Sequence, residues 1–119
     1  MSAEHIIFAA LSGLVGGRVY PDVAPQSAAL PRIVYQQVGG LAVDHQEGKP
    51  ADLENARMQI VCWAADRDTA SALAKQVEDA LLAAPAPVQA TRLGARVSVV
   101  DDDTGLRGAR QDFSVWLPR

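Results

Sequence analysis

The stretch Ala56–Ala83, ARMQIVCWAADRDTASALAKQVEDALLA, decides the fold because its hydrophobic period changes partway along. In its first part Ile60 and Cys62 belong to an apolar series on every second residue, which is the period of a half-buried strand. After Asp66 or Asp68, either of which can cap a helix, apolar residues recur at helical spacing. They are Ala70, Leu73, Ala74, Val77, Ala80 and Leu81. The stretch therefore predicts a strand followed by an amphipathic helix, with Cys62 in the core.

The residues before this stretch predict a helix and a strand. Ser2 can cap a helix that ends at Gly16-Gly17, because glycine readily takes the left-handed conformation that closes a helix. The loop PDVAPQSAALP follows, and its prolines exclude a long helix or a central strand. Arg32–Val38 alternates and is rich in β-branched residues, as in a strand. The polar segment QEGKPAD then predicts a hairpin turn into the strand that contains Cys62.

The residues after the helix complete the predicted fold. Pro85 and Pro87 end the helix, and RVSVV and QDFSVWL alternate as two strands joined by the polar turn DDDTGLRGA. Because short turns favour antiparallel pairing, we expect an α+β fold in the order α-β-β-α-β-β. The prediction is a two-layer sandwich with a mainly antiparallel four-stranded sheet and two helices packed on one face. Residues 1–119 are expected to form a single domain, because the chain has an ordinary domain length.

Composition and charge argue against several classes of function. Eleven Lys and Arg against fourteen Asp and Glu give a net charge of −3, without the basic run typical of nucleic-acid binding. The apolar N-terminal stretch IIFAALSGLVGG is shorter than the roughly 20 residues that span a bilayer, and no basic region precedes it. We therefore expect no specific nucleic-acid binding, no signal peptide and no membrane anchor.

Catalytic, metal and cofactor sites are not expected either. Cys62 is the single cysteine, and the two histidines, His5 and His45, are remote from it in sequence. The run Asp101–Asp103 opens DDDTGL, but Leu106 stands where a calcium loop requires glycine, so a solvated turn is the better interpretation. The glycine pairs lack the spacing of a phosphate-binding loop.

Three segments carry a resemblance to a known family. They are GGRVYPDVAPQSAALPRIVYQQV, ENARMQIVCWAADRDTASALAKQVEDALL and, closer to the C-terminus, DDDTGLRGARQDFSVW. Together they make the whole chain resemble the tail completion proteins of long-tailed bacteriophages and prophages, the head-to-tail joining and tail terminator group. The resemblance implies a structural protein, not an enzyme, that caps the tail tube, stops its polymerisation and helps to join tail to head. It also implies a ring, expected to be a hexamer, in the virion at the head-tail junction, assembled in the bacterial host cytoplasm.

The expected partners are other copies of the chain, the major tail tube protein and the head completion or connector protein. A ring closes through contacts between different patches of neighbouring subunits, so protruding loops are the natural contact surfaces. The candidate interface residues lie in the loop Pro21–Pro31, in the hairpin tip His45–Asp52 and in the acidic turn. They are Pro25, Gln26, His45, Glu47, Lys49, Asp101, Asp102 and Asp103. The alternative is a small ligand-binding or regulatory α+β module, which would show an apolar cavity with convergent polar groups.

Overall fold

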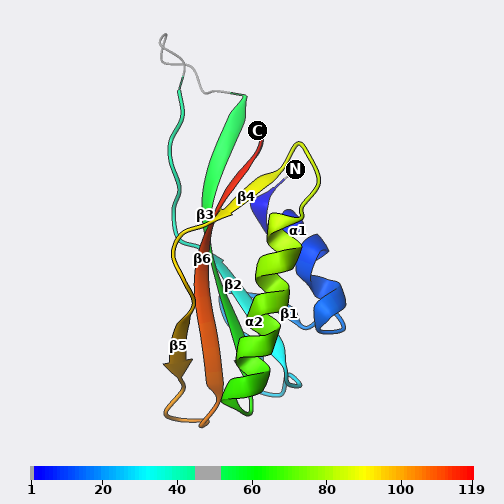
Figure 1. The fold of residues 1–119 in the computed structure, drawn as a ribbon, viewed down its shortest axis with the longest axis vertical. Helices are drawn as coiled ribbons and strands as arrows, with labels where there is room; N and C mark the ends of the chain where they lie inside the picture. Colours follow the sequence, from blue (N-terminus) through cyan, green and yellow to red (C-terminus); the bar gives the residue numbers. More distant parts are fainter. Residues whose placement is uncertain (1, 45–51) are drawn as a thin grey trace.

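The computed structural model describes residues 2–44 and 52–119, which form two α-helices, a short 3-10 helix and a β-sheet (Figure 1). The elements follow one another as α1 Ala3–Leu11, η1 Ser12–Leu14, β1 Val19–Pro21, β2 Arg32–Gln37, β3 Leu53–Ala64, α2 Arg67–Leu82, β4 Gln89–Arg92, β5 Val97–Val100 and β6 Arg107–Pro118. His45, Glu47 and Lys49 lie outside the described residues. No helix within 2–44 and 52–119 is long and apolar enough to cross a membrane.

The sheet has six strands in the order β1-β2-β3-β6-β4, and β5 also pairs with β6. The two central strands, β3 and β6, are each twelve residues long and pair antiparallel along their whole length, from Leu53↔Pro118 to Ala64↔Arg107. β4 pairs with residues 113–116 of β6 and β5 with residues 107–110, so β4 and β5 share one edge of the sheet. The opposite edge is β1, which is parallel to β2.

The prediction of an α+β fold with two helices is confirmed, but the predicted four strands and the predicted order α-β-β-α-β-β are wrong, because the sheet has six strands and both β1 and β4 were missed. The sheet is mixed, because β1 crosses over to pair parallel with β2. β1 has three residues and β4 buries only Ala90, so neither contains enough alternation to reveal a strand. The last strand also begins earlier than predicted, since Arg107, Gly108 and Ala109 already belong to β6.

The caps predicted for both helices are present. The side chain of Ser2 accepts a hydrogen bond from the His5 amide, and Gly16 and Gly17 follow η1 with φ of 57° and 84°. Of the two alternatives for α2, the structure selects Asp66, whose carboxylate accepts from the amide of Thr69 at 2.8 Å and from its hydroxyl at 2.9 Å. These contacts satisfy N–H groups that have no partner inside the helix.

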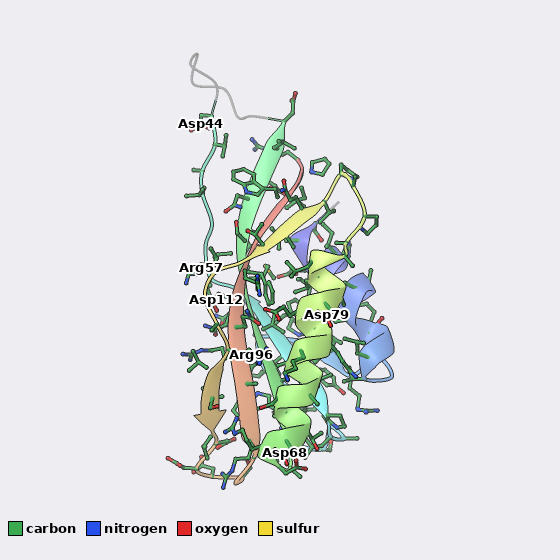
Figure 2. The ribbon with its side chains drawn as sticks, viewed as in Figure 1. Asp44, Arg57, Asp68, Asp79, Arg96 and Asp112 are labelled. Carbon is green, nitrogen blue, oxygen red and sulfur yellow. The ribbon has the colours of Figure 1, made fainter. Side chains whose placement is uncertain are left out.

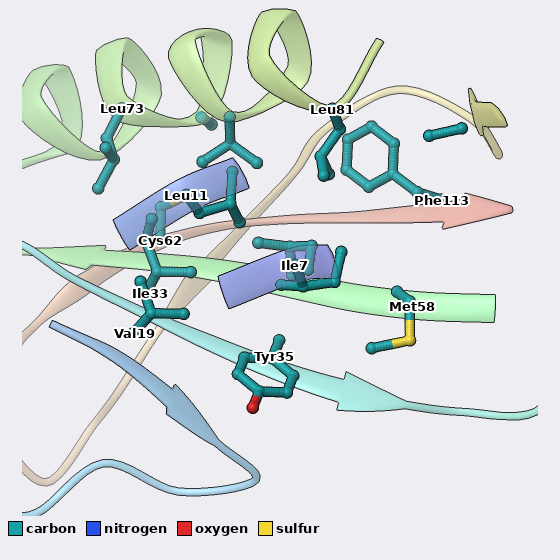
Figure 3. Packing of buried hydrophobic residues seen from close by; sticks show 14 of the residues in the cluster. Ile7, Leu11, Val19, Ile33, Tyr35, Met58, Cys62, Leu73, Leu81 and Phe113 are labelled. Atoms are coloured by element: carbon teal, nitrogen blue, oxygen red, sulfur yellow. The ribbon is translucent and has the colours of Figure 1, made fainter. Parts of the chain in front are cut away.

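Both helices cover one face of the sheet, and the core lies between them and the strands (Figure 3). The predicted alternation of β3 is confirmed, because its even-numbered side chains from Ala56 to Ala64 are buried beneath the helices. The largest fully buried side chains are those of Phe113, Ile7, Leu11, Ile33, Met58, Ile60, Leu81 and Leu117. Cys62 is 1% exposed, so its prediction as a core residue is also confirmed. No helix of the part of the chain that the structure describes covers the opposite face of the sheet (Figure 1).

The molecule is elongated, with extents of 51 × 26 × 25 Å. Beyond β2 the chain continues as an extended segment beside β3, held by hydrogen bonds between Val38 and Arg57, between Arg57 and Gly39, and from the Leu41 amide to the Asn55 side chain. This segment leads to Asp44, at the end of the molecule opposite Asp68 in the first turn of α2 (Figure 2). The two ends therefore present different loops.

Candidate assembly surfaces

Cys62 has the properties of a core residue and not of a nucleophile. Burial raises the pKa of its thiol to about 12, so the thiol is protonated at neutral pH. Cys62 lines none of the surface hollows described below. Within residues 2–44 and 52–119, no three His, Cys, Asp or Glu side chains gather in a way that could hold a metal ion.

The proline-rich loop is exposed but tied to the body of the protein. Pro25 and Gln26 are exposed at a turn closed by a hydrogen bond from the Ala28 amide to the Pro25 carbonyl. The guanidinium of Arg18 donates to the Pro31 carbonyl at 2.9 Å, and that of Arg32 donates to the Ala28 carbonyl at 3.0 Å. The loop is thus presented to solvent from two anchor points, Arg18 directly before β1 and Arg32 at the start of β2.

The acidic turn connects β5 to β6, and several of its backbone and side-chain polar groups form hydrogen bonds with one another. The Asp101 carboxylate accepts from the Asp103 amide at 3.0 Å, and the backbone of Asp101 bonds to Gly105 and Leu106. Asp102 and Asp103 are exposed. This geometry supports the interpretation of DDDTGL as a solvated turn that ends a hairpin.

The fold brings the proline-rich loop and the acidic turn together at one end of the molecule. Both contribute to a hollow of about 250 Å³, whose lining is Asp22, Val23, Ala24, Arg32, Val34, Trp63 and Asp101. The Nε atom of Arg32 is buried there without a hydrogen-bond partner. Tryptophan and arginine in a surface hollow are the residue types that most often anchor protein interfaces. Pro25 and Gln26 lie close by in sequence but do not line the hollow.

The uncovered face of the sheet is a second surface, which the sequence analysis did not single out. Its side chains come from the alternate positions of β3 and β6, where Trp63 stands opposite Gly108 and Asn55 opposite Trp116. Arg57 and Asp112 form an ion pair of 2.9 Å on this face. The period-two pattern of β3 could have revealed this face. Side chains alternate along a strand, so the residues that do not point into the core must point to the opposite face.

A polar hollow of about 670 Å³ lies at the β4–β5 edge, against α2. Its charged lining residues are Glu78 of α2, Arg92 at the end of β4 and Arg96 between the two strands. The Glu78 carboxylate is 3.3 Å from Arg92 and 3.8 Å from Arg96, and it accepts a hydrogen bond from the buried Gln111 side chain at 3.2 Å. The Gln111 hydrogen bond, followed by the two arginines, lowers the pKa of Glu78. Sequence spacing could not reveal this cluster, because its members come from separate elements.

An apolar groove of about 550 Å³ runs between α1, the end of α2 and the loop before β4. Among the described residues that line the groove, His5 has the one polar side chain, and the others are alanine, isoleucine, proline and valine. The apolar groove and the charged hollow are therefore separate. Neither one combines an apolar cavity with convergent polar groups, which the ligand-binding alternative would require.

Comparisons with known proteins identify the family of the chain. The sequence profile of the family described as "Tail completion protein gp17" matches residues 8–117, nearly the whole chain. The chain belongs to the tail completion protein gp17 family. Tail completion proteins are structural components of phage particles, so the predicted family membership and the predicted structural role are confirmed at this level. No curated protein matches the sequence.

A solved structure shares the fold of this tail completion protein. It is a chain from "Virion of native gene transfer agent (GTA) particle", with a TM-score of 0.74 and 18% identity. The alignment covers 99% of this chain and 96% of that chain. At this identity the likeness concerns the fold, which is therefore one that also occurs in a phage-like virion.

Proposed function

We propose that this protein caps the finished tail tube, stops its polymerisation and helps to join the tail to the head. The family match over residues 8–117 is the observation that carries this proposal. The virion origin of the structure with the same fold supports it. The function needs a rigid body that offers one surface to the tube and another to the connector. A long sheet backed by helices, with different loops at its two ends, meets this requirement.

The protein is proposed to act as a ring, with six copies as the expected number. Residues 1–119 act as a single domain in this proposal, because the two central strands and α2 share one core. A ring requires two unlike patches on each subunit. The two edges of the sheet differ, since one is the short strand β1 and the other is β4 with β5, and this difference supports the proposal. The other partners are the major tail tube protein and the head connector, in particles assembled in the cytoplasm of a bacterial host.

The contact surfaces are proposed to include all eight residues predicted from the sequence. Pro25, Gln26 and Asp101–Asp103 lie on loops that meet near Trp63, at one end of the molecule. His45, Glu47 and Lys49 remain predictions, because they fall outside the described residues. Asp101–Asp103 or Glu47 are proposed to face the channel, where acidic groups would let DNA pass without gripping it. A cryo-electron microscopy map with all of them on the outer wall of the ring would contradict this assignment.

Deletion of the gene from the phage or prophage tests the proposed function. The expected result is DNA-filled heads beside separate or overlong tails in electron micrographs, with infectious particles restored by the gene in trans. Complementation with Cys62→Ala should also restore joining, because the role needs no nucleophile. Normal particle numbers and normal tail lengths after deletion would contradict the proposal.

A further inference from the structure

The extended segment Val38–Asp44 lies beside β3, but its apolar side chains are not packed into the core. Val38 is 39% exposed, Leu41 65% and Val43 37%. Two hollows, of about 460 and 240 Å³, lie where the segment meets the sheet, and both Leu41 and Asn55 line each of them. Apolar burial along the segment is therefore incomplete, so its position depends strongly on hydrogen bonds.

The main chain of the segment departs from regular strand pairing where it begins. The Val38 amide donates to the Arg57 carbonyl at 2.8 Å, and the Arg57 amide donates to the Gly39 carbonyl at 2.8 Å. Two consecutive residues thus share one partner on β3, as in a β-bulge. Gly39 and Gly40 have φ of 118° and 149°, values that favour glycine. Beyond this bulge the Leu41 amide bonds to a side chain of β3 in place of a main-chain carbonyl.

That side chain is the carboxamide of Asn55, which joins the segment to both central strands. Its Oδ1 accepts from the Leu41 amide at 2.9 Å, and its Nδ2 donates to the Ser114 hydroxyl at 2.8 Å and to the Val115 carbonyl at 3.4 Å. The orientation of the carboxamide follows from these partners, because the Leu41 N–H can only donate and the Val115 carbonyl can only accept. Asn55 belongs to β3, whereas Ser114 and Val115 belong to β6. One side chain therefore connects three neighbouring stretches of the chain.

Both ends of the carboxamide are needed at this position. Aspartate would keep an acceptor for the Leu41 amide but would place an oxygen against the Val115 carbonyl, and alanine would leave both ends without a partner. The main chain is fitted to the same point, because a Cβ at Gly40 would lie 2.3 Å from the Asn55 carbonyl oxygen. The close approach at Gly40 and the side-chain bond to Leu41 together hold the segment against Asn55.

We propose that Asn55 is a positioning residue for the joining of tail to head, because its carboxamide sets the direction in which the segment Val38–Asp44 leaves the sheet. This proposal rests on the proposed function, which requires a defined surface at each end of the molecule. Asp44 lies at one of these ends (Figure 2). A segment that could swing about the bulge would have to be ordered on contact, at a cost in conformational entropy. The Asn55 carboxamide orders it before assembly.

Hydrogen exchange followed by NMR tests this positioning in the purified chain. Asn55→Ala should raise the exchange rate of the Leu41 amide roughly fivefold, because one net hydrogen bond is lost. Asn55→Asp keeps an acceptor for this amide and should raise the rate less. The matched control is Gln59→Ala, on the same face of β3 but opposite Gln36 of β2, and it should leave the rate unchanged. Equal rates in wild type and Asn55→Ala would overturn the proposal.

Complementation of the gene deletion separates positioning from stability. At equal amounts of folded protein, Asn55→Ala should join fewer heads to tails than Gln59→Ala does, and Asn55→Asp should restore part of the loss. If Asn55→Ala does not fold, Ser114→Ala gives the same comparison, because it removes a partner of the Nδ2 end. Equal joining by the test variant and Gln59→Ala, despite faster exchange at Leu41, would overturn the proposal. Normal particles in the deletion itself would contradict the proposed function instead, so the two failures are distinguishable.

Discussion

Replacement of Gly108 by alanine is expected to lower the free energy of unfolding although glycine is usually a poor residue inside a strand. A Cβ atom at Gly108 would lie 2.7 Å from a methyl group of Val99 and 2.9 Å from two ring carbons of Trp63. Overpacking of this kind costs about 1–3 kcal/mol, whereas removal of glycine from the unfolded chain returns about 0.5–1 kcal/mol. The difference between these two effects is a net loss of stability of about 0–2.5 kcal/mol. The new methyl group should also displace the ring of Trp63, which lines the hollow between the proline-rich loop and the acidic turn.

Urea denaturation followed by circular dichroism and tryptophan fluorescence measures both effects. The matched control is Gly13→Ala in η1, where a Cβ would meet no atom within 4 Å. The control should therefore stabilise the protein by about 0.5–1 kcal/mol. If Gly108→Ala is as stable as Gly13→Ala and the emission of the folded state is unchanged, the described packing of Trp63 against β6 is wrong.

Three further predictions concern the extended segment after β2, the α2 cap and the buried thiol. Gly40→Ala should destabilise the Val38–Asp44 segment, measured as faster amide exchange, more than Gly39→Ala does, because only at Gly40 would a Cβ collide with the Asn55 carbonyl, at 2.3 Å; equal effects would contradict the contact. Hydrogen bonds from Thr69 lower the pKa of Asp66, so the stabilisation by Asp66 is full at neutral pH and declines as the pH falls below the ordinary aspartate pKa. The stability difference between wild type and Asp66→Ala, from urea titrations, should shrink over that range, and a constant difference would argue against the cap. Cys62 should react with a thiol reagent at pH 8 only at the rate of unfolding, and rapid labelling of the folded protein would contradict its burial.

The parts of the fold that bury an apolar face could be predicted from the sequence. β3 and α2 were predictable because a long run of alternate residues and a helical stripe must each face the core. β1 and β4 were not, because their place in the sheet depends on pairing with distant strands and not on a pattern of their own. The parallel pairing of β1 with β2 follows from the crossover through the proline-rich loop, whose path no local spacing encodes.

The surfaces were less predictable than the core. The sequence pointed to the proline-rich loop and the acidic turn as exposed, but their meeting over Trp63 depends on the crossover and on the β5–β6 hairpin. The cluster around Glu78 joins a helix to an edge of the sheet and has no sequence signature. Such a charge cluster is a product of tertiary structure, because its members are brought together from separate elements.

A cryo-electron microscopy map of the head-tail junction would test the central claim most directly. The account predicts a closed ring of this chain between the last ring of the tail tube and the head connector. A junction in which this chain is absent, or in which another protein forms that ring, would contradict it.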